Sequence, residues 1–241
     1  MNFNHSRMAT LLRSVPTSTT LVFIAAVIAM NFLARISLLS LPWISLNAGI
    51  TVSWLSFLLI DILAKHYGVK AANLMSVLAI TVNVTVCLLC SAVGHLWNHP
   101  ALNMVVGGQW SILLASTLAY VISAATNNYT NIFIGKKMTA DPDGKKAFAA
   151  RSFVSTLLSQ VVDNFLFVFL AFVVFPLIPG AFPVRWTLLQ CLGGSVTCAF
   201  LELFSEMVFT PFGYRIVRKW KREGVGKEYL ERYCPNGVLE G

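Results

Sequence analysis

The sequence predicts an all-α integral membrane protein with six transmembrane helices, and three observations lead to that fold class. Of the 241 residues, 56% are hydrophobic and only 12% are charged, whereas soluble globular chains carry about 25% charged residues. The apolar runs come close to the about 20 residues that a helix needs to cross a bilayer. Lys and Arg are concentrated between alternate runs, as in multi-pass membrane proteins. An ordinary soluble domain is therefore excluded.

Proline and glycine divide the chain into these apolar runs. Pro42 separates the first two, and the third is followed by an external loop that contains Pro100 and the pair Gly107-Gly108. Pro211 is expected to mark the cytoplasmic end of the sixth. The predicted spans cover residues 21–39, 48–64, 71–93, 111–134, 153–175 and 186–209, and a basic cytoplasmic tail follows at 212–241. We expect a single membrane domain over residues 1–241.

The net charge of +8 and the pI near 9.4 are interpreted as signs of membrane topology. Every Lys and Arg except Arg35 and Arg185 lies before the first run, between the second and third, between the fourth and fifth, or after the sixth. The positive-inside rule places these segments and both termini in the cytoplasm, and it requires an even number of spans. We expect a bacterial inner (plasma) membrane location. The basic tail can also contact anionic headgroups or a nucleic acid, but orientation is the simpler interpretation, and no nucleic-acid partner is expected.

Acidic and amide side chains within the runs are the candidate functional groups, because a charged residue at the bilayer centre costs about 2.5–3.5 kcal/mol on insertion scales. Interhelical hydrogen bonding would explain isolated Ser or Thr residues, whereas Asp163, Glu202 and Glu206 together favour a hydrated site. Polar residues at helical spacing share a face. Such stripes occur in the fourth run (Tyr120, Ser123, Asn127, Asn131), the fifth (Ser152, Thr156, Gln160, Asp163) and the sixth (Gln190, Gly194, Cys198, Glu202, Glu206).

No catalytic, metal or cofactor motif stands out in the chain. It lacks the H-E-x-x-H, G-x-S-x-G and G-x-x-x-x-G-K-[ST] patterns. Cys87 and Cys90 form a C-x-x-C pair inside an apolar run, and His95 and His99 lie in a loop beside Pro100. We interpret them as apolar and interfacial residues, and we expect no enzyme, no cofactor and no metal site.

Several motifs resemble one known family. They are Asn31-x-x-x-Arg35 in the first run, Asp61 followed by Tyr67-Gly68, Arg151-x-x-x-Ser155-Thr156-x-x-x-Gln160-x-x-Asp163 in the fifth, and Thr210-Pro211-Phe212-x-Tyr214 at the end of the sixth. Together they resemble the queuosine precursor transporters, also called vitamin uptake transporters. The resemblance extends from the first run to Tyr214, and the fifth-run motif is its most specific part.

This resemblance implies a compact six-helix bundle, similar to the substrate-binding subunits of energy-coupling-factor vitamin transporters. It also implies a 7-deazapurine cargo, whose N–H donors a carboxylate such as Asp163 can accept. Trp54, Tyr129 or Phe165 can stack on such a ring. The family pattern differs at Trp54, Lys65, Ala124, Asn127 and Glu202, which leaves the identity of the solute open. The expected substrate-binding residues are Asn31, Arg35, Asp61, Asn127, Thr156, Gln160, Asp163, Glu202 and Glu206.

Three classes of function stay open at this point. The leading one is uptake of a small polar heterocycle, a queuosine precursor or a related base or vitamin, by facilitated or proton-linked transport. The second is a substrate-binding subunit of an ATP-driven energy-coupling-factor complex, and the third is an intramembrane enzyme. For Asp61, which precedes Lys65 by four residues, an intrahelical ion pair and a ligand contact are both open. The expected partners are a small solute and the bilayer, and a homo-oligomer or an energising complex is left undecided.

Overall fold

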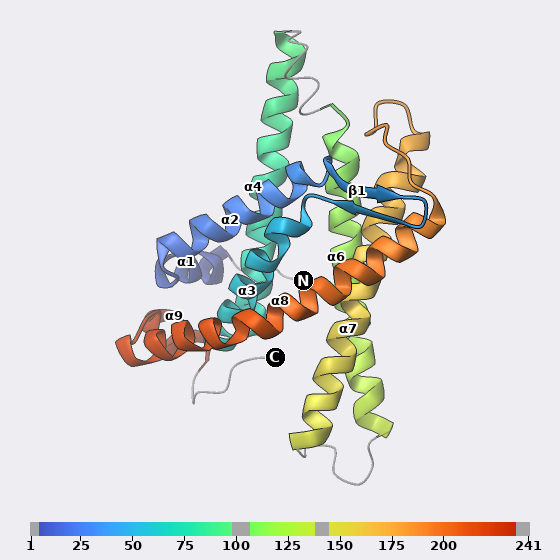
Figure 1. Cartoon of the computed structure of the whole chain (residues 1–241). Coiled ribbons are helices and arrows are strands. Elements are labelled where there is room, and N and C mark those ends of the chain that lie inside the picture. The colour runs from blue at the N-terminus through green and yellow to red at the C-terminus, as the bar shows by residue number, and fades with distance from the viewer. Residues whose placement is uncertain (1–4, 98–106, 138–144, 235–241) are drawn as a thin grey trace. The chain divides into compact units, whose positions relative to one another are not determined.

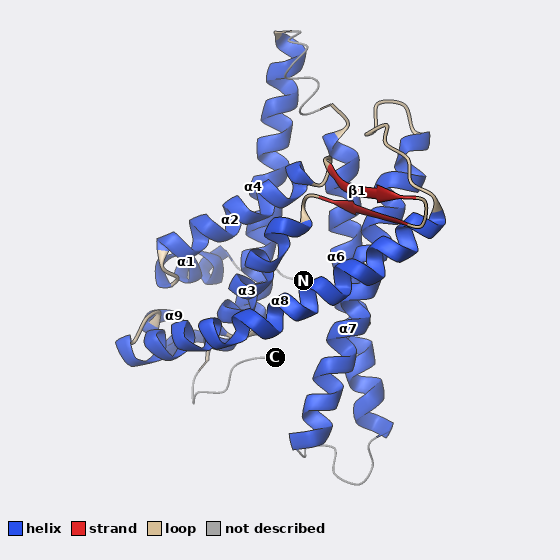
Figure 2. Ribbon diagram, viewed as in Figure 1, coloured by secondary structure: helices blue, strands red, loops and turns tan. Residues whose placement is uncertain are grey.

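The computed structural model describes residues 5–97, 107–137 and 145–234. These residues are mostly helical, with one two-stranded sheet (Figures 1 and 2). Contacts within the chain divide it into two compact units. The first contains residues 1–30, 49–88 and 204–241, and the second contains residues 31–48 and 89–203. Three of the described helices, α2, α4 and α8, begin in one unit and end in the other.

The first unit is built on α3, whose residues supply much of its core. Its elements are α1 (His5–Ser14), most of α2 (Thr17–Leu33), α3 (Ile50–Tyr67), most of α4 (Val69–Leu96), the C-terminal part of α8 (Leu188–Glu223) and α9 (Lys227–Tyr233). Leu63 and Tyr67 of α3 are buried with Leu11 and Tyr229 in one apolar cluster. The Tyr67 hydroxyl donates a hydrogen bond of 2.7 Å to the carbonyl oxygen of Ser14, which links the end of α3 to the end of α1.

Local sequence explains where the helices of this unit begin and end. Pro16 separates α1 from α2, which are bent by 107° relative to each other, because the residue before a proline is disfavoured in helical conformation. Gly68 ends α3 with φ of 91°, a left-handed conformation that costs glycine little, and its N–H donates to the carbonyl oxygen of Ala64. The chain then enters α4 at once.

The second unit contains the β-hairpin and two long helices that pack side by side, α6 and α7 (Figure 1). Its elements are β1 (Ser37–Leu41), β2 (Ile44–Asn47), α6 (Gln109–Lys137), α7 (Lys145–Phe169), a π-helical turn (Leu170–Val174), a short 3-10 turn (Phe175–Leu177) and the N-terminal part of α8. Ile112, Ala171, Phe172 and Cys191 are fully buried in its core. The Phe172 ring stacks on Trp186 at 4.2 Å.

The hairpin corrects the predicted end of the first span. Helix α2 ends at Leu33, and residues 37–41, which include the last three of the predicted span 21–39, form a strand. Pro42 and Trp43 make the connecting turn, and Leu41 pairs with Ile44. Proline is favoured at the second position of a tight turn because its ring fixes φ near −65°. The apolar residues of 36–41 therefore extend a hairpin and not the helix.

Helix α8 extends beyond the predicted span 186–209, because it continues through Pro211 to Glu223. Residues 212–223, predicted as the start of a basic tail, are thus helical. Proline inside a helix costs about 3 kcal/mol relative to alanine. Packing on α3 offsets that cost: Phe209 stacks on Trp54 at 4.2 Å, and Gly213 lies against Leu58.

Four helical segments within the described residues are long and apolar enough to cross a membrane. They are Ile50–Tyr67, Val69–Gly94, Leu157–Leu177 and Leu188–Ser205, and the bent pair Ser6–Ser14 and Thr17–Leu33 makes five if it counts as one span. The predicted span 111–134 falls on α6, of which Gln109–Ser123 is a shorter apolar stretch. The chain therefore has the helices of a multi-pass membrane protein, while the count of six and the cytoplasmic termini stay predictions.

Candidate functional site

Within the second unit, an acidic side chain connects the two long helices. Asp163 lies on α7 at helical spacing from Gln160, and Ser123 lies on the facing side of α6. The Ser123 hydroxyl is 2.8 Å from Asp163 Oδ1, to which it donates, and it also lies 3.0 Å from the carbonyl oxygen of Tyr120 on its own helix. Among the described residues, the other carboxylate oxygen of Asp163 receives no hydrogen bond. One oxygen of Asp163 is thus available to a further donor.

The next residue of α7 connects this pair to α8. Asn164 Nδ2 donates to Glu202 Oε2 at 2.8 Å and to the carbonyl oxygen of Gln160 at 3.0 Å. Glu202 is buried, so its carboxylate relies on polar neighbours and not on bulk water. Three helices of this unit, α6, α7 and α8, therefore bring two carboxylates and their hydrogen-bond donors together.

Gln160 adds an acceptor that is not satisfied. Its carboxamide oxygen is buried and has no hydrogen-bond partner among the described residues. Gln160 lies one helical turn before Asp163 and Asn164 on the same helix. A buried acceptor without a partner costs about 1–3 kcal/mol, and a bound molecule with an N–H or O–H group would remove that cost. We call Ser123, Gln160, Asp163, Asn164 and Glu202 the polar cluster.

Two other expected residues lie in the second unit, at the end of α2 and just beyond it. Asn31 is buried, and its carbonyl oxygen accepts a 3.1 Å hydrogen bond from Gln109 Nε2. The Arg35 guanidinium lies over the Phe182 ring, 4.6 Å from its centroid. Both residues therefore have neighbours within the second unit.

Asp61 belongs to the first unit and lies in an ion pair. Its carboxylate oxygen is 2.6 Å from Lys65 Nζ, one helical turn later on α3. Of the two interpretations left open by the sequence, the structure contains the intrahelical pair. The expected residues Asn127, Thr156 and Glu206 lie on α6, α7 and α8, but their side chains fall outside the described residues.

The aromatic residues expected to stack on a ring have other neighbours. Trp54 is stacked on Phe209 in the first unit, and Phe165 is stacked on Phe169 at 5.6 Å along α7. The Tyr129 side chain is 75% exposed. None of the three is positioned at the polar cluster by a described contact.

Sequence reasoning left Ser123 and Asn164 out of the expected site, although it placed Ser123 in the polar stripe of the fourth run. The signal for Asn164 was its position four residues after Gln160 and next to Asp163. Gln109 carried no signal of this kind, because it lies at the start of its helix; yet it is buried, and its carboxamide oxygen has no partner among the described residues. A helical face predicts which residues are neighbours but not which of them contact the next helix.

Most of the chain matches one known protein family. Residues 47–216, well over half of the sequence, match the family described as "Putative vitamin uptake transporter". This range includes the entire polar cluster. No curated protein and no solved structure matches the chain. The chain therefore belongs to this family of vitamin uptake transporters, and it is a multi-pass membrane protein of a solute-uptake class.

Proposed function

We propose that the chain takes up a small, planar, polar heterocycle across a bacterial inner membrane, with a 7-deazapurine precursor of queuosine or a related base or vitamin as the solute. Family membership supports uptake of a solute. The polar cluster supports the class of solute, because it offers two carboxylates and one unsatisfied carboxamide oxygen in a largely apolar helical unit. The unsatisfied oxygen of Gln160 is the observation that carries the proposal.

The chemistry of the cluster is that of an acceptor site. Ser123 and Asn164 each donate to one carboxylate oxygen, which orients Asp163 and Glu202. The remaining oxygen of Asp163 and the carboxamide oxygen of Gln160 are then acceptors without donors in the described chain. An aminopyrimidinone edge presents neighbouring N–H groups, and hydrogen bonds to charged acceptors are worth about 1.5–3 kcal/mol. Such a solute complements this site better than an anion does.

The proposed mode of transport uses the same carboxylates. Proton-linked uptake needs ionisable groups within the spanning helices, and we propose Asp163 and Glu202 as these groups. Facilitated transport uses the same site without a proton. Dependence on an ATP-driven energy-coupling complex is the alternative, and uptake by the purified chain in ATP-free vesicles would exclude it.

The function is tested by rescue of queuosine in transfer RNA. Cells that cannot make the precursor and lack their own carrier are given this chain and each precursor in the medium. We expect rescue by the wild-type chain and loss of at least nine-tenths of it with Asp163→Asn or Gln160→Ala, because each variant removes an acceptor of the proposed site.

The matched control is Glu228→Gln, which also converts an acid to an amide but lies exposed on α9. It is expected to leave rescue unchanged. Membrane abundance of every variant is measured in the same cells. Rescue by both cluster variants at normal abundance would contradict the proposed binding site. Failure of the wild-type chain to rescue with any precursor would contradict the proposed solute.

A further inference from the structure

The part of α8 that belongs to the first unit has two distinct faces. Phe209, Gly213, Val217 and Trp220 form the inward face, which packs on α3: Phe209 stacks on Trp54, and Trp220 contacts His66 with ring centroids 5.3 Å apart. The position of Gly213 against Leu58 and Ile62 completes this contact. The opposite face of the helix is consequently left outside the unit.

The first part of the outward face, over residues 204–212, is apolar. Its large side chains at helical spacing are all more than half exposed: Phe204 64%, Met207 67%, Val208 53% and Phe212 57%. These positions rise about 12 Å along the helix axis. An exposed apolar stripe of this kind on a membrane protein is suited to contact with acyl chains.

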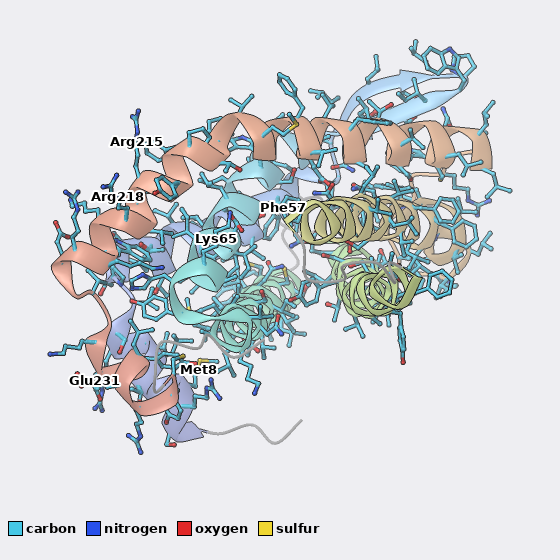
Figure 3. The ribbon with its side chains drawn as sticks, turned by 90° about the horizontal axis from the view of Figure 1, so that it is seen from below. Met8, Phe57, Lys65, Arg215, Arg218 and Glu231 are labelled. Atoms are coloured by element: carbon cyan, nitrogen blue, oxygen red, sulfur yellow. The ribbon has the colours of Figure 1, made fainter. Side chains whose placement is uncertain are left out.

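The same face becomes basic within one turn. Arg215, Arg218, Lys219 and Arg222 follow Phe212 at helical spacing, and all are exposed. Figure 3 shows Arg215 and Arg218 directed away from the body of the unit. Among the described residues, Lys219 has a distant carboxylate neighbour, Glu223, at 3.9 Å, and no carboxylate forms an ion pair with the three arginines. We call these four residues the basic stripe.

Tyr214 marks the boundary between the two halves of this face. Its side chain is 62% exposed and lies between the apolar stripe and Arg215. Tyrosine is enriched where hydrocarbon meets headgroups. Along this part of α8 the exposed side chains thus change from apolar to interfacial aromatic to cationic. A bilayer changes in the same order, from acyl chains through the interface to the headgroups.

We propose that the basic stripe is a binding site for anionic phospholipid headgroups of the phosphatidylglycerol class. The apolar stripe sets the depth of this site in the bilayer. A lipid whose acyl chains contact Phe212 and Met207 has its headgroup at Arg215 and Arg218. Arg presents a planar fork that matches the phosphate geometry, and three of the four cations are Arg. The site does not depend on the identity of the transported solute.

The test compares two variants that remove the same number of positive charges. The stripe variant is R215Q/R218Q/K219Q/R222Q, and the control is R13Q/K221Q/K227Q/R232Q, whose residues are also exposed. Each full-length chain is reconstituted in equal parts of phosphatidylcholine and phosphatidylglycerol and then extracted in mild detergent, and its retained lipids are quantified by mass spectrometry. Attraction of about 1 kcal/mol per cation corresponds to about fivefold enrichment for each.

We expect the wild-type chain and the control to retain phosphatidylglycerol at least fivefold over phosphatidylcholine, and the stripe variant to retain the two within twofold. Extraction in high salt is expected to reduce the wild-type ratio, because salt screens exposed charges. No enrichment in the wild-type chain would overturn the proposal, as would an equal loss in the control, which would indicate a net-charge effect. If the stripe variant does not elute as a single folded species, R218Q/R222Q against K221Q/K227Q gives the same comparison.

Discussion

At the scale of single residues, two glutamines of the second unit differ in how their carboxamide groups are hydrogen-bonded. Both the oxygen and the nitrogen of the Gln190 carboxamide form hydrogen bonds. The Thr187 N–H donates to Oε1 at 2.9 Å, and Nε2 donates to the carbonyl oxygen of Leu41 at 2.8 Å. The carboxamide oxygen of Gln160 is buried without a partner among the described residues. Gln190 therefore stabilises the fold, whereas the unpartnered carboxamide oxygen of Gln160 lowers the stability of the solute-free protein.

This contrast predicts opposite effects of the same substitution. Gln160→Leu removes an unsatisfied acceptor, so we expect the solute-free protein to gain about 1–3 kcal/mol of stability, seen as a higher thermal unfolding midpoint. Gln190→Leu breaks two hydrogen bonds and is expected to lower the midpoint by a similar amount. Thermal unfolding in detergent measures both, and a lower midpoint for Gln160→Leu would show that its carboxamide oxygen is satisfied in the folded chain.

At the scale of elements, the β-hairpin is held on the N-terminal part of α8 by two adjacent glycines (Figure 1). A Cβ atom at Gly193 would overlap the carbonyl oxygen of Trp43, and one at Gly194 would overlap that of Ser45. Backbone of the hairpin thus lies directly on backbone of the helix. The Gln190 side chain extends the same contact to Leu41.

The hairpin contact is tested by comparing two glycines of α8. Gly194→Ala places a methyl group on rigid backbone, so it is expected to lower the unfolding midpoint and to expose residues 37–47 to protease. Gly213→Ala is the control, because its nearest neighbours would be side-chain atoms of Leu58, at 3.1 Å, and Ile62 and not backbone, and alanine is the better helix former. Equal midpoints for the two variants would argue against close packing of the hairpin.

The elements also show what sequence can and cannot predict. The apolar runs of α3, α4 and α7 predicted their helices, because length and hydropathy are properties of the chain itself. The end of α2 and the hairpin were missed, since Leu38 and Leu39 have the apolar character of the preceding helix. Helix α8 passes Pro211 because α3 packs against it, and such tertiary support leaves no local signal.

At the scale of the whole molecule, the chain is a multi-pass membrane protein of the vitamin uptake transporter family. The polar stripes predicted that Asp163 and Glu202 would share a region, and both lie in the polar cluster of the second unit. The same reasoning grouped Asp61 with them, although it pairs with Lys65 in the first unit. Helical spacing is local, so it cannot assign a residue to one unit or the other.

The topology gives a prediction for the entire chain. Because Lys and Arg gather at both ends and in two connections, we expect reporters fused at residues 68, 140 and 241 to have cytoplasmic activity, and reporters at 100 and 180 to have external activity. Paired reporters that are active on opposite sides of the membrane check each position. Activity of the residue 241 fusion outside the cytoplasm would contradict the even number of spans.

The central claim is that the polar cluster holds the solute, and direct binding tests it most closely. Equilibrium binding of radiolabelled 7-deazapurine precursors to the purified chain is compared with binding to Asp163→Asn and to the exposed-acid control Glu228→Gln. The account predicts saturable binding to the wild-type chain and the control, and at least a tenfold weaker affinity for Asp163→Asn, since an acceptor for a charged hydrogen bond is lost. Unchanged affinity of a folded Asp163→Asn protein would contradict it.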